Sequence, residues 1–232
     1  MARYLVIAAS SSIGQAVTNA LKAQGDSVFT TARDKTKINP DILLDATDFD
    51  AVNEAFQLAG TIDGVVNCSG SLLLKPAHTT SKEQYQSIID SSLTTSFATV
   101  HAAGNYMKKG GSVVLIASAA ALVGLANHEA IAAAKAGIIG LAQSAAATYA
   151  TINLRFNVIA PGMIDSPLTT QLIKNEAMYH ASKAMHALGR IGKPEDIAQA
   201  ILFLLNPQNS WITGQVIAVD GGLSRVRPKI KI

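Results

Sequence analysis

The segment 8–14, with the sequence AASSSIG, combines residues that suit the binding of an anion. It follows a short apolar run and leads into a segment of helical period, so backbone N–H groups at a helix start would face the ligand. A phosphate group is the ligand that such a turn favours. The loop contains one glycine, however, and an ordinary helix capped by serine would use the same residues. On these residues alone, both interpretations stay open.

Cys68 is the single cysteine of the chain, which excludes an internal disulfide and a cysteine-based zinc site and suits a reducing compartment. We expect no metal site. A basic C-terminal tail could contact an anion or a nucleic acid, or be solvated; it comprises Arg225, Arg227, Lys229 and Lys231. Aromatic residues are 5% of the chain and the net charge is +3, without the basic stripe typical of nucleic-acid binders. We therefore expect no nucleic-acid partner.

The elements that must position these residues alternate along the chain. Short runs that are apolar on both faces indicate parallel strands covered by helices on both sides. We expect about seven strands, near 4–8, 27–31, 42–44, 64–67, 112–117, 153–159 and 215–219. Segments of helical period include 13–24, 48–59, 82–108, 129–149 and 195–205. The alternation predicts an α/β fold with a doubly wound, Rossmann-like parallel sheet, which binds ligands at the carboxyl ends of its strands.

The chain length of 232 residues, with 49% hydrophobic and 15% charged residues, favours one domain over 1–232 and excludes a disordered chain. The connection between the second and third strands, about ten residues, barely admits a crossover helix, and we expect a loop there. No run reaches the roughly 18 to 20 apolar residues of a membrane span, and the first apolar run is too short for a signal peptide. We expect a cytoplasmic protein without a membrane partner.

Later segments carry a family resemblance. They are 65–70 (VVNCSG), 155–167 (RFNVIAPGMIDSP), 189–198 (GRIGKPEDIA), 212–215 (ITGQ) and 219–222 (VDGG). In this order and spacing they resemble the short-chain dehydrogenase/reductase family across essentially the whole chain. The resemblance implies an oxidoreductase with a nicotinamide cofactor and a small-molecule substrate beneath a lid at about 166–190. It also implies a homo-oligomer, a tetramer or at least a dimer, paired through the helices near 90–108 and 129–149.

The cofactor residues follow from the same resemblance. The family's glycine motif keeps only its third glycine, Gly14, while Ala8 and Ser12 replace the others. Cys68 lies inside the family's Asn-x-x-Gly strand end and is interpreted as a packing residue, with a redox role as the alternative. The implied cofactor-binding positions are Ala8, Ser10, Ser11, Ser12, Ile13, Gly14, Arg33, Asp45, Ala46, Asn67, Ser69, Gly70, Lys135, Pro161, Gly162, Ile164 and Ser166.

The end of the second strand predicts which dinucleotide is bound. Family members that prefer NAD place a carboxylate near Ala32, and alanine cannot bind the ribose diol. Arg33 can pair with a 2′-phosphate through its guanidinium group, although a solvated surface arginine is the alternative. We therefore expect NADP(H).

The catalytic residues depart most from the family, whose active members use Asn, Ser, Tyr and Lys. Ser118 and Lys135 match the serine and the lysine, while Ser92 stands for the asparagine and Ile131 for the tyrosine. Isoleucine has no proton to give. Ser118 and Lys135 could also be retained for cofactor binding or helix geometry alone.

His128 is a candidate replacement for the missing tyrosine. The pattern His128-x-x-Ile131-x-x-x-Lys135 resembles that of the family's enoyl reductase branch with histidine for tyrosine, and an imidazole can donate a proton at neutral pH. A loop histidine beside a helix start is the alternative. Two functions stay open: an NADP(H)-dependent oxidoreductase acting on a small carbonyl, alcohol or enoyl substrate with an atypical proton donor, and a silent NADP(H)-binding subunit or sensor.

Overall fold

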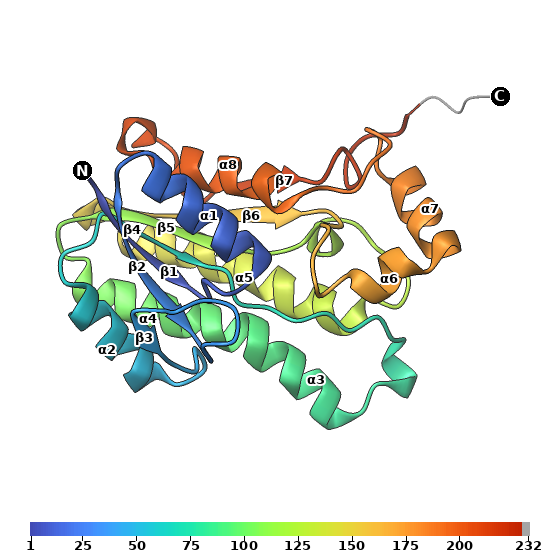
Figure 1. Cartoon of the computed structure of the whole chain (residues 1–232), viewed down its shortest axis with the longest axis horizontal. Helices are drawn as coiled ribbons and strands as arrows, with labels where there is room; N and C mark the ends of the chain where they lie inside the picture. Colours follow the sequence, from blue (N-terminus) through green and yellow to red (C-terminus); the bar gives the residue numbers. More distant parts are fainter. Residues whose placement is uncertain (229–232) are drawn as a thin grey trace.

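Residues 1–228, which a computed structural model of the protein describes, form a seven-stranded sheet that is parallel throughout (Figure 1). The strand order is β3-β2-β1-β4-β5-β6-β7, as in a doubly wound fold. The strands are β1 (Arg3–Ile7), β2 (Ser27–Ala32), β3 (Ile42–Leu43), β4 (Gly64–Asn67), β5 (Gly111–Ile116), β6 (Leu154–Pro161) and β7 (Val216–Val219). The predicted fold class is confirmed. Of the basic tail, Arg225 and Arg227 are exposed, while Lys229 and Lys231 lie outside the described residues.

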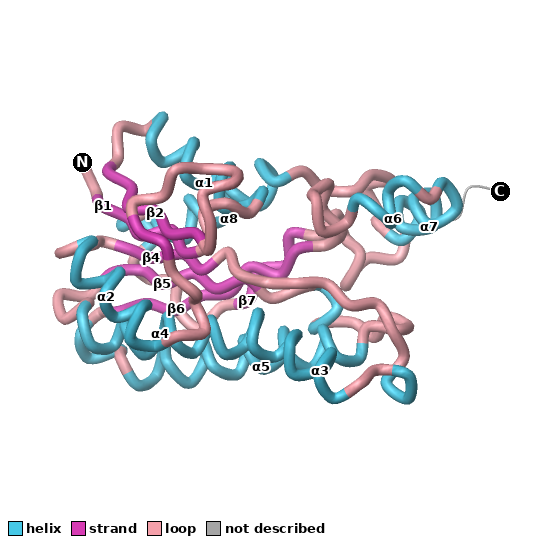
Figure 2. The backbone as a smooth tube through the Cα atoms, turned by 60° about the horizontal axis from the view of Figure 1, so that its bottom comes forward, coloured by secondary structure: helices cyan, strands magenta, loops and turns pink. Residues whose placement is uncertain are grey.

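Helices cover both faces of this sheet. In Figures 1 and 2, α1 and α8 lie on one face and α2, α4 and α5 on the other, while α6 and α7 project beyond the end of the sheet. The helices are α1 (Ser12–Ala23), α2 (Phe49–Ala59), α3 (Lys82–Ile89), α4 (Thr95–Tyr106), α5 (Glu129–Thr148), α6 (Thr170–Lys174), α7 (Glu176–Met185) and α8 (Pro194–Leu205). Neither α6 nor α7 was predicted as a helix from the sequence.

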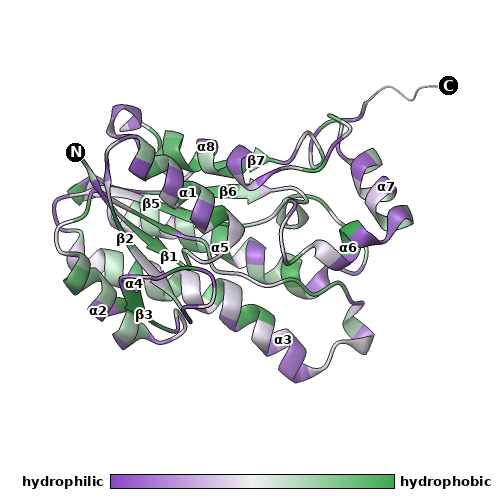
Figure 3. Cartoon of the chain, viewed as in Figure 1, coloured by the Kyte–Doolittle hydropathy of each residue, from purple (hydrophilic) through white to green (hydrophobic). Residues whose placement is uncertain are grey.

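The core has two layers because successive side chains of a buried strand point to opposite faces. Leu5 and Ile7 of β1 pack with α2, α4 and α5, while Tyr4 and Val6 pack with α1 and α8. Hydrophobic residues accordingly gather on the strands in Figure 3, and hydrophilic residues on the outer turns of α1, α3 and α7. Burial on both sides explains why the strands are continuously apolar.

The connection from β2 to β3 spans residues 33–41, all of them described, and contains no helix. Asp41 ties this loop back to β2, because its carboxylate accepts hydrogen bonds from the backbone N–H and the hydroxyl of Thr30, both at 2.7 Å. The predicted loop is therefore present. It leaves the carboxyl end of β2 open to a ligand.

The helix predicted over 82–108 is interrupted. A π-helical turn, Asp90–Thr94, separates α3 from α4. Within it, the carbonyl of Ser92 accepts hydrogen bonds from the hydroxyls of Thr95 (3.1 Å) and Ser96 (2.7 Å). Such side-chain bonds compete with the regular helical pattern, and hydrophobic periodicity gives no sign of them.

Helix α5 has 20 residues and is apolar enough, by length and composition, to cross a membrane. No segment of this kind was predicted from the sequence. In the fold, α5 packs against β6 and α4, and Ile138 and Ala142 on its inner face are buried. A core helix of this type passes the same test of length and composition.

Candidate active site

A cleft of about 1350 Å³ opens at the carboxyl ends of the strands, between the loop before α1, the start of α5 and the lid. It brings together most of the predicted residues. Its lining includes Ala8, Ser10, Ser11, Ser12, Ile13, Arg33, Asp45, Ala46, Ser69, Gly70, Ser118, His128, Lys135, Pro161, Gly162, Ile164 and Ser166. Residues up to 158 positions apart in the chain thus share one site.

Three predicted site residues do not line the cleft. Gly14 packs α1 against the preceding loop, because a Cβ there would lie 2.6 Å from the carbonyl oxygen of Ala8. Asn67 donates from Nδ2 to the Thr95 carbonyl oxygen, and its Oδ1 accepts from the Ser69 N–H at 2.8 Å. Ser92 is fully buried, and its hydroxyl has no hydrogen-bond partner among residues 1–228. Gly14 and Asn67 therefore shape the cleft from behind.

The loop before α1 has the geometry of an anion site. Ser11 caps the helix, accepting at its hydroxyl oxygen from the Gly14 N–H at 3.1 Å, while the N–H groups of the first turn have no intrahelical partner. Ala8 adopts φ +57°, a left-handed conformation that favours glycine, as the family motif implies for this position. Serine capping and anion binding are thus compatible, because the cap leaves the N–H groups of Ser12 and Ile13 available.

The wall beyond β2 is basic. Arg33 and Lys37 both line the cleft, whereas the carboxylate of Asp34 is bonded to the N–H and hydroxyl of Thr36. Asp45 lies on the same wall, and hydrogen bonds from Thr47, together with the charge of Arg33, hold the pKa of its carboxyl below the usual value. The wall therefore presents two cations and one firmly ionised carboxylate.

Ser118 and Lys135 approach the cleft from β5 and α5. The Ser118 oxygen accepts from the Ala120 N–H at 3.2 Å, which leaves its own O–H free to donate. Lys135 is 5% exposed and donates from Nζ to the Ile116 carbonyl oxygen at 2.8 Å. Burial lowers the pKa of Lys135 to about 8, because no carboxylate within the described chain forms an ion pair with it. Gly70 leaves room for this amine, since a Cβ there would lie 3.3 Å from Nζ.

The tyrosine position is apolar in the fold as well. Ile131 lines the cleft but is 3% exposed, packing with Ile88 and Ala134 in a small cluster. Cys68 is also buried at the cleft, and burial raises the pKa of its thiol to about 12. A thiol that stays protonated is a poor nucleophile, which favours the packing interpretation of Cys68 over the redox one.

His128 stands immediately before α5, at its N-cap position, rather than inside the helix. Its Nδ1 lies 2.7 Å from the carbonyl oxygen of Ala126, so Nδ1 must carry a proton. Nε2 is then the nitrogen that can gain and release a proton. Because the ring lines the same cleft as Lys135, the geometry is compatible with proton donation.

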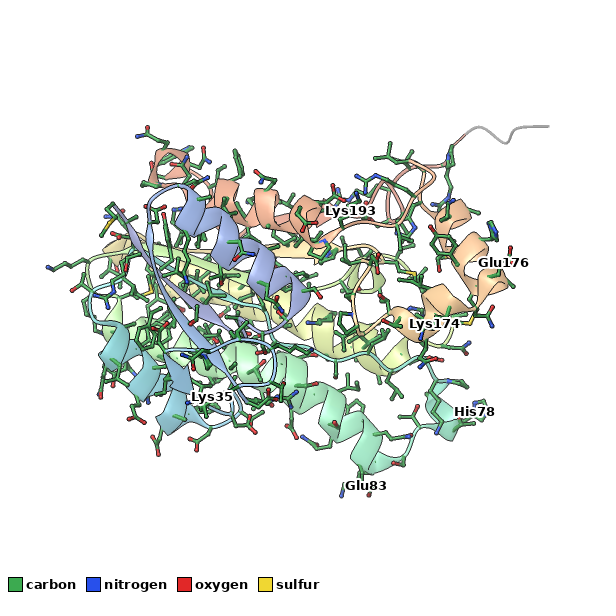
Figure 4. All side chains as sticks on the ribbon, in the orientation of Figure 1. Lys35, His78, Glu83, Lys174, Glu176 and Lys193 are labelled. Carbon is green, nitrogen blue, oxygen red and sulfur yellow. The ribbon has the colours of Figure 1, made fainter. Side chains whose placement is uncertain are left out.

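The lid contributes α6 and α7. Met178, Met185 and His186 line the cleft, whereas Tyr179 and His180 do not. His180 has an exposed side chain 3.6 Å from Glu176, and Lys183 lies over the Tyr179 ring. Figure 4 shows Glu176 on α7 at the outer edge of the molecule. Tyr179 and His180 therefore lie outside the site.

Sequence reasoning missed several lining residues. Lys37 was not singled out, although basic residues at 33, 35 and 37 on a short loop were a usable signal. Leu72 and Leu74 in the loop after β4, with Leu168 and Leu172 of the lid, form an apolar part of the lining that no motif marks. Within residues 1–228, the fold assembles no group of three or more potential metal ligands.

The comparisons with known proteins agree with this fold. The family described as enoyl-(acyl carrier protein) reductase matches residues 7–224. The 3-oxoacyl-acyl-carrier-protein reductase FabG of Thermotoga maritima is 34% identical, over 94% of this chain and 96% of its own. An inactive 2-(S)-hydroxypropyl-CoM dehydrogenase 2 of Xanthobacter autotrophicus is 33% identical, over 82% and 85%. The structure of a short-chain type dehydrogenase/reductase from Mycobacterium ulcerans superimposes with a TM-score of 0.92 at 28% identity, covering 98% of this chain and 91% of that one.

These matches, with the parallel sheet and the cleft, define a Rossmann-like protein of the oxidoreductase type. The chain belongs to the short-chain dehydrogenase/reductase family.

Proposed function

We propose that the protein is an NADP(H)-dependent oxidoreductase that transfers a hydride to or from a small carbonyl, alcohol or enoyl substrate. The observation that carries this proposal is the meeting, in one cleft, of the α1 anion loop, the basic wall and the Ser118–Lys135 pair. A cleft of about 1350 Å³ is larger than a typical small-ligand pocket of roughly 300 to 1,000 Å³, which suits a dinucleotide with a substrate beside it.

The residues fit NADP(H) at three places. The first turn of α1 would hold the pyrophosphate, and Arg33 with Lys37 would pair with the 2′-phosphate. Lys135 would hold the nicotinamide ribose, beside the space left by Gly70. When bound, NADPH supplies the hydride.

The chain's own residues then handle the oxygen and the proton. Ser118 donates its free O–H to the substrate carbonyl oxygen, and the charged form of Lys135 stabilises negative charge nearby. His128 supplies the proton from Nε2, while Ala126 keeps the Nδ1 proton in place. The apolar lining from Leu72, Leu168 and Met178 favours a substrate with an aliphatic substituent.

A second candidate function is a silent NADP(H)-binding subunit or sensor. Ile131 is packed in an apolar cluster, and the inactive dehydrogenase relative shows that matched chains include proteins without activity. Both functions use the same cofactor site. They differ in whether a proton can be delivered next to Ser118.

The discriminating experiment supplies NADPH with deuterium at C4 to a broad panel of carbonyl and enoyl compounds. The wild type should transfer deuterium to at least one class. Ile131→Tyr should create or raise reduction of generic carbonyls by up to about 10²-fold, whereas Ile131→Phe, with the same ring and no hydroxyl, should not. A wild type that binds NADPH but transfers nothing, beside an active Ile131→Tyr variant, would favour the silent subunit. Inactivity of both would contradict the oxidoreductase proposal.

We also propose that the protein is cytoplasmic and forms a homotetramer, or at least a dimer, through α4 and α5. Of the small residues on α5, Ala133, Ala136 and Gly140 are exposed. Gly137 instead packs against Leu93 of the same chain, because a Cβ at position 137 would lie 2.9 Å from the Leu93 side chain. Phe97 on α4 is 50% exposed and adds apolar area on that helix. Light scattering at micromolar concentration should give a dimer or tetramer mass, and a monomer mass would contradict this.

A further inference from the structure

His186, at the C-terminal end of α7, joins the lid to the end of β6. The residue is 3% exposed. Its Nε2 accepts a hydrogen bond from the Met163 N–H at 3.1 Å, and its Nδ1 donates to the Ser182 carbonyl oxygen at 2.6 Å. A carbonyl can only accept and an N–H can only donate. Both bonds together therefore require a neutral ring with its proton on Nδ1.

The backbone around this ring is shaped to admit it. A Cβ at position 162 would lie 2.7 Å from Nε2, so Gly162 is needed for the close approach of the imidazole to β6. The His186 carbonyl accepts from the Gly189 N–H at 2.8 Å, and Leu188 donates to the Gly221 carbonyl oxygen at 3.0 Å. The base of the lid is thus held at several points, with the imidazole at the centre.

One carboxylate faces the ring. Asp220, in the loop after β7, is 7% exposed and bonded to Gly222 and Ser224. Burial raises the pKa of Asp220, but these hydrogen bonds and the nearby imidazole outweigh that effect and keep the pKa below its usual value. On the lid itself, Lys183 contacts His186 through its backbone carbonyl and turns its ammonium toward Tyr179. The β6 side, Gly162 and Met163, carries no ionisable group.

We propose that His186 is a positioning residue that locks the base of the lid to Met163 only while its imidazole is neutral, and that protonation shifts the ring toward Asp220 and releases the lid. A protonated imidazole carries an N–H on both nitrogens, so Nε2 can no longer accept from Met163. Two donors then face each other, while the Asp220 carboxylate offers an acceptor. The lock concerns the free protein, and its effect on cofactor binding rests on the proposed function.

Hydrogen–deuterium exchange of the segment 166–190 in the full chain, without cofactor, tests the lock. Rates are compared at about pH 7.5 and about pH 5.5 after correction for intrinsic exchange, a range in which imidazoles titrate. The wild type should exchange roughly 10- to 100-fold faster at the lower pH, the effect of one lost buried hydrogen bond. The exposed His180 in the same helix provides the matched control, since His180→Gln should behave as the wild type does.

Two variants separate the lock from simple packing. His186→Gln keeps an acceptor for Met163 that does not titrate, so its lid should stay protected at both pH values. His186→Phe fills the same space without an acceptor, so the lid of this variant should exchange fast at both pH values. A pH-independent lid in the wild type, or a pH dependence that persists in His186→Gln, would overturn the proposal even if His186→Phe failed to fold.

NADPH titrations of the same proteins extend the test. Wild-type affinity should fall on acidification by about tenfold more than that of His186→Gln. If both proteins bind NADPH and their affinities show the same pH dependence, the proposed effect of the lid on cofactor binding would be overturned. Absence of NADPH binding, with the exchange pattern intact, would instead contradict the proposed function and leave the lock standing.

Discussion

At the α1 end of the cleft, the groups that would meet a cofactor are mainly backbone N–H groups, whereas at the α5 end they are individual side chains. The α1 end tolerates Ala8 and Ser12 where the family has glycine, because the helix start still presents its N–H groups. The α5 end loses a proton donor outright when isoleucine stands at position 131. Dinucleotide binding can therefore survive substitutions of a kind that would stop catalysis, unless another side chain has taken over.

If His128 has taken over as proton donor, the largest effect should follow from its removal. His128→Ala should lower turnover by about 10² to 10⁴-fold, the usual span for general acid catalysis, and leave NADPH affinity unchanged. Steady-state rates on the best substrate of the panel, with cofactor titrations alongside, measure both. His180→Ala is the control, because that ring lies on the outer face of the lid. A rate in His128→Ala equal to that of the wild type would show that another group donates the proton.

Loss of the positive charge of Lys135 should lower turnover by less than loss of His128. Burial lowers the pKa of this lysine to about 8, so its cationic form is complete well below that pH and is lost as the pH rises through it. Turnover should therefore fall on the alkaline side of about pH 8, and Lys135→Met should lower the rate about tenfold or more at neutral pH. A pH–rate profile checks this, with Lys109→Met as control, because Lys109 is exposed and lies outside the cleft lining. A flat profile between about pH 7 and about pH 9 would contradict the role.

The smallest predicted effect concerns the backbone conformation of the loop before α1. Ala8 is held at φ +57°, which costs an L-residue free energy, so Ala8→Gly should raise the free energy of unfolding by about 0.5 to 1 kcal/mol. The adjacent Ala9 is buried without a positive φ, and Ala9→Gly should destabilise by a similar amount. Urea denaturation of the two variants measures both. Destabilisation by Ala8→Gly would show that the alanine is unstrained.

The sequence predicted what depends on local pattern. Continuous apolar runs identified the strands, and the short connection after β2 identified the loop at 33–41. Most of the site residues predicted from the family motifs line the cleft. The π-helical turn at Ser92 was missed because hydroxyl-to-carbonyl bonds decide it. The pairing of His186 with Met163, 23 residues apart, depends on how the lid folds back over β6, which no spacing encodes.

The proposed function requires first of all that the protein binds NADPH in preference to NADH, through Arg33 and Lys37 at the end of β2. Cofactor fluorescence titrations of the wild type and of Arg33→Ala test this most directly. A charge-assisted pair with the 2′-phosphate contributes about 1.5 to 3 kcal/mol, which predicts a preference for NADPH of roughly 10- to 100-fold in the wild type and most of it lost in Arg33→Ala. Equal affinities for the two cofactors in the wild type, or binding of neither, would contradict the account.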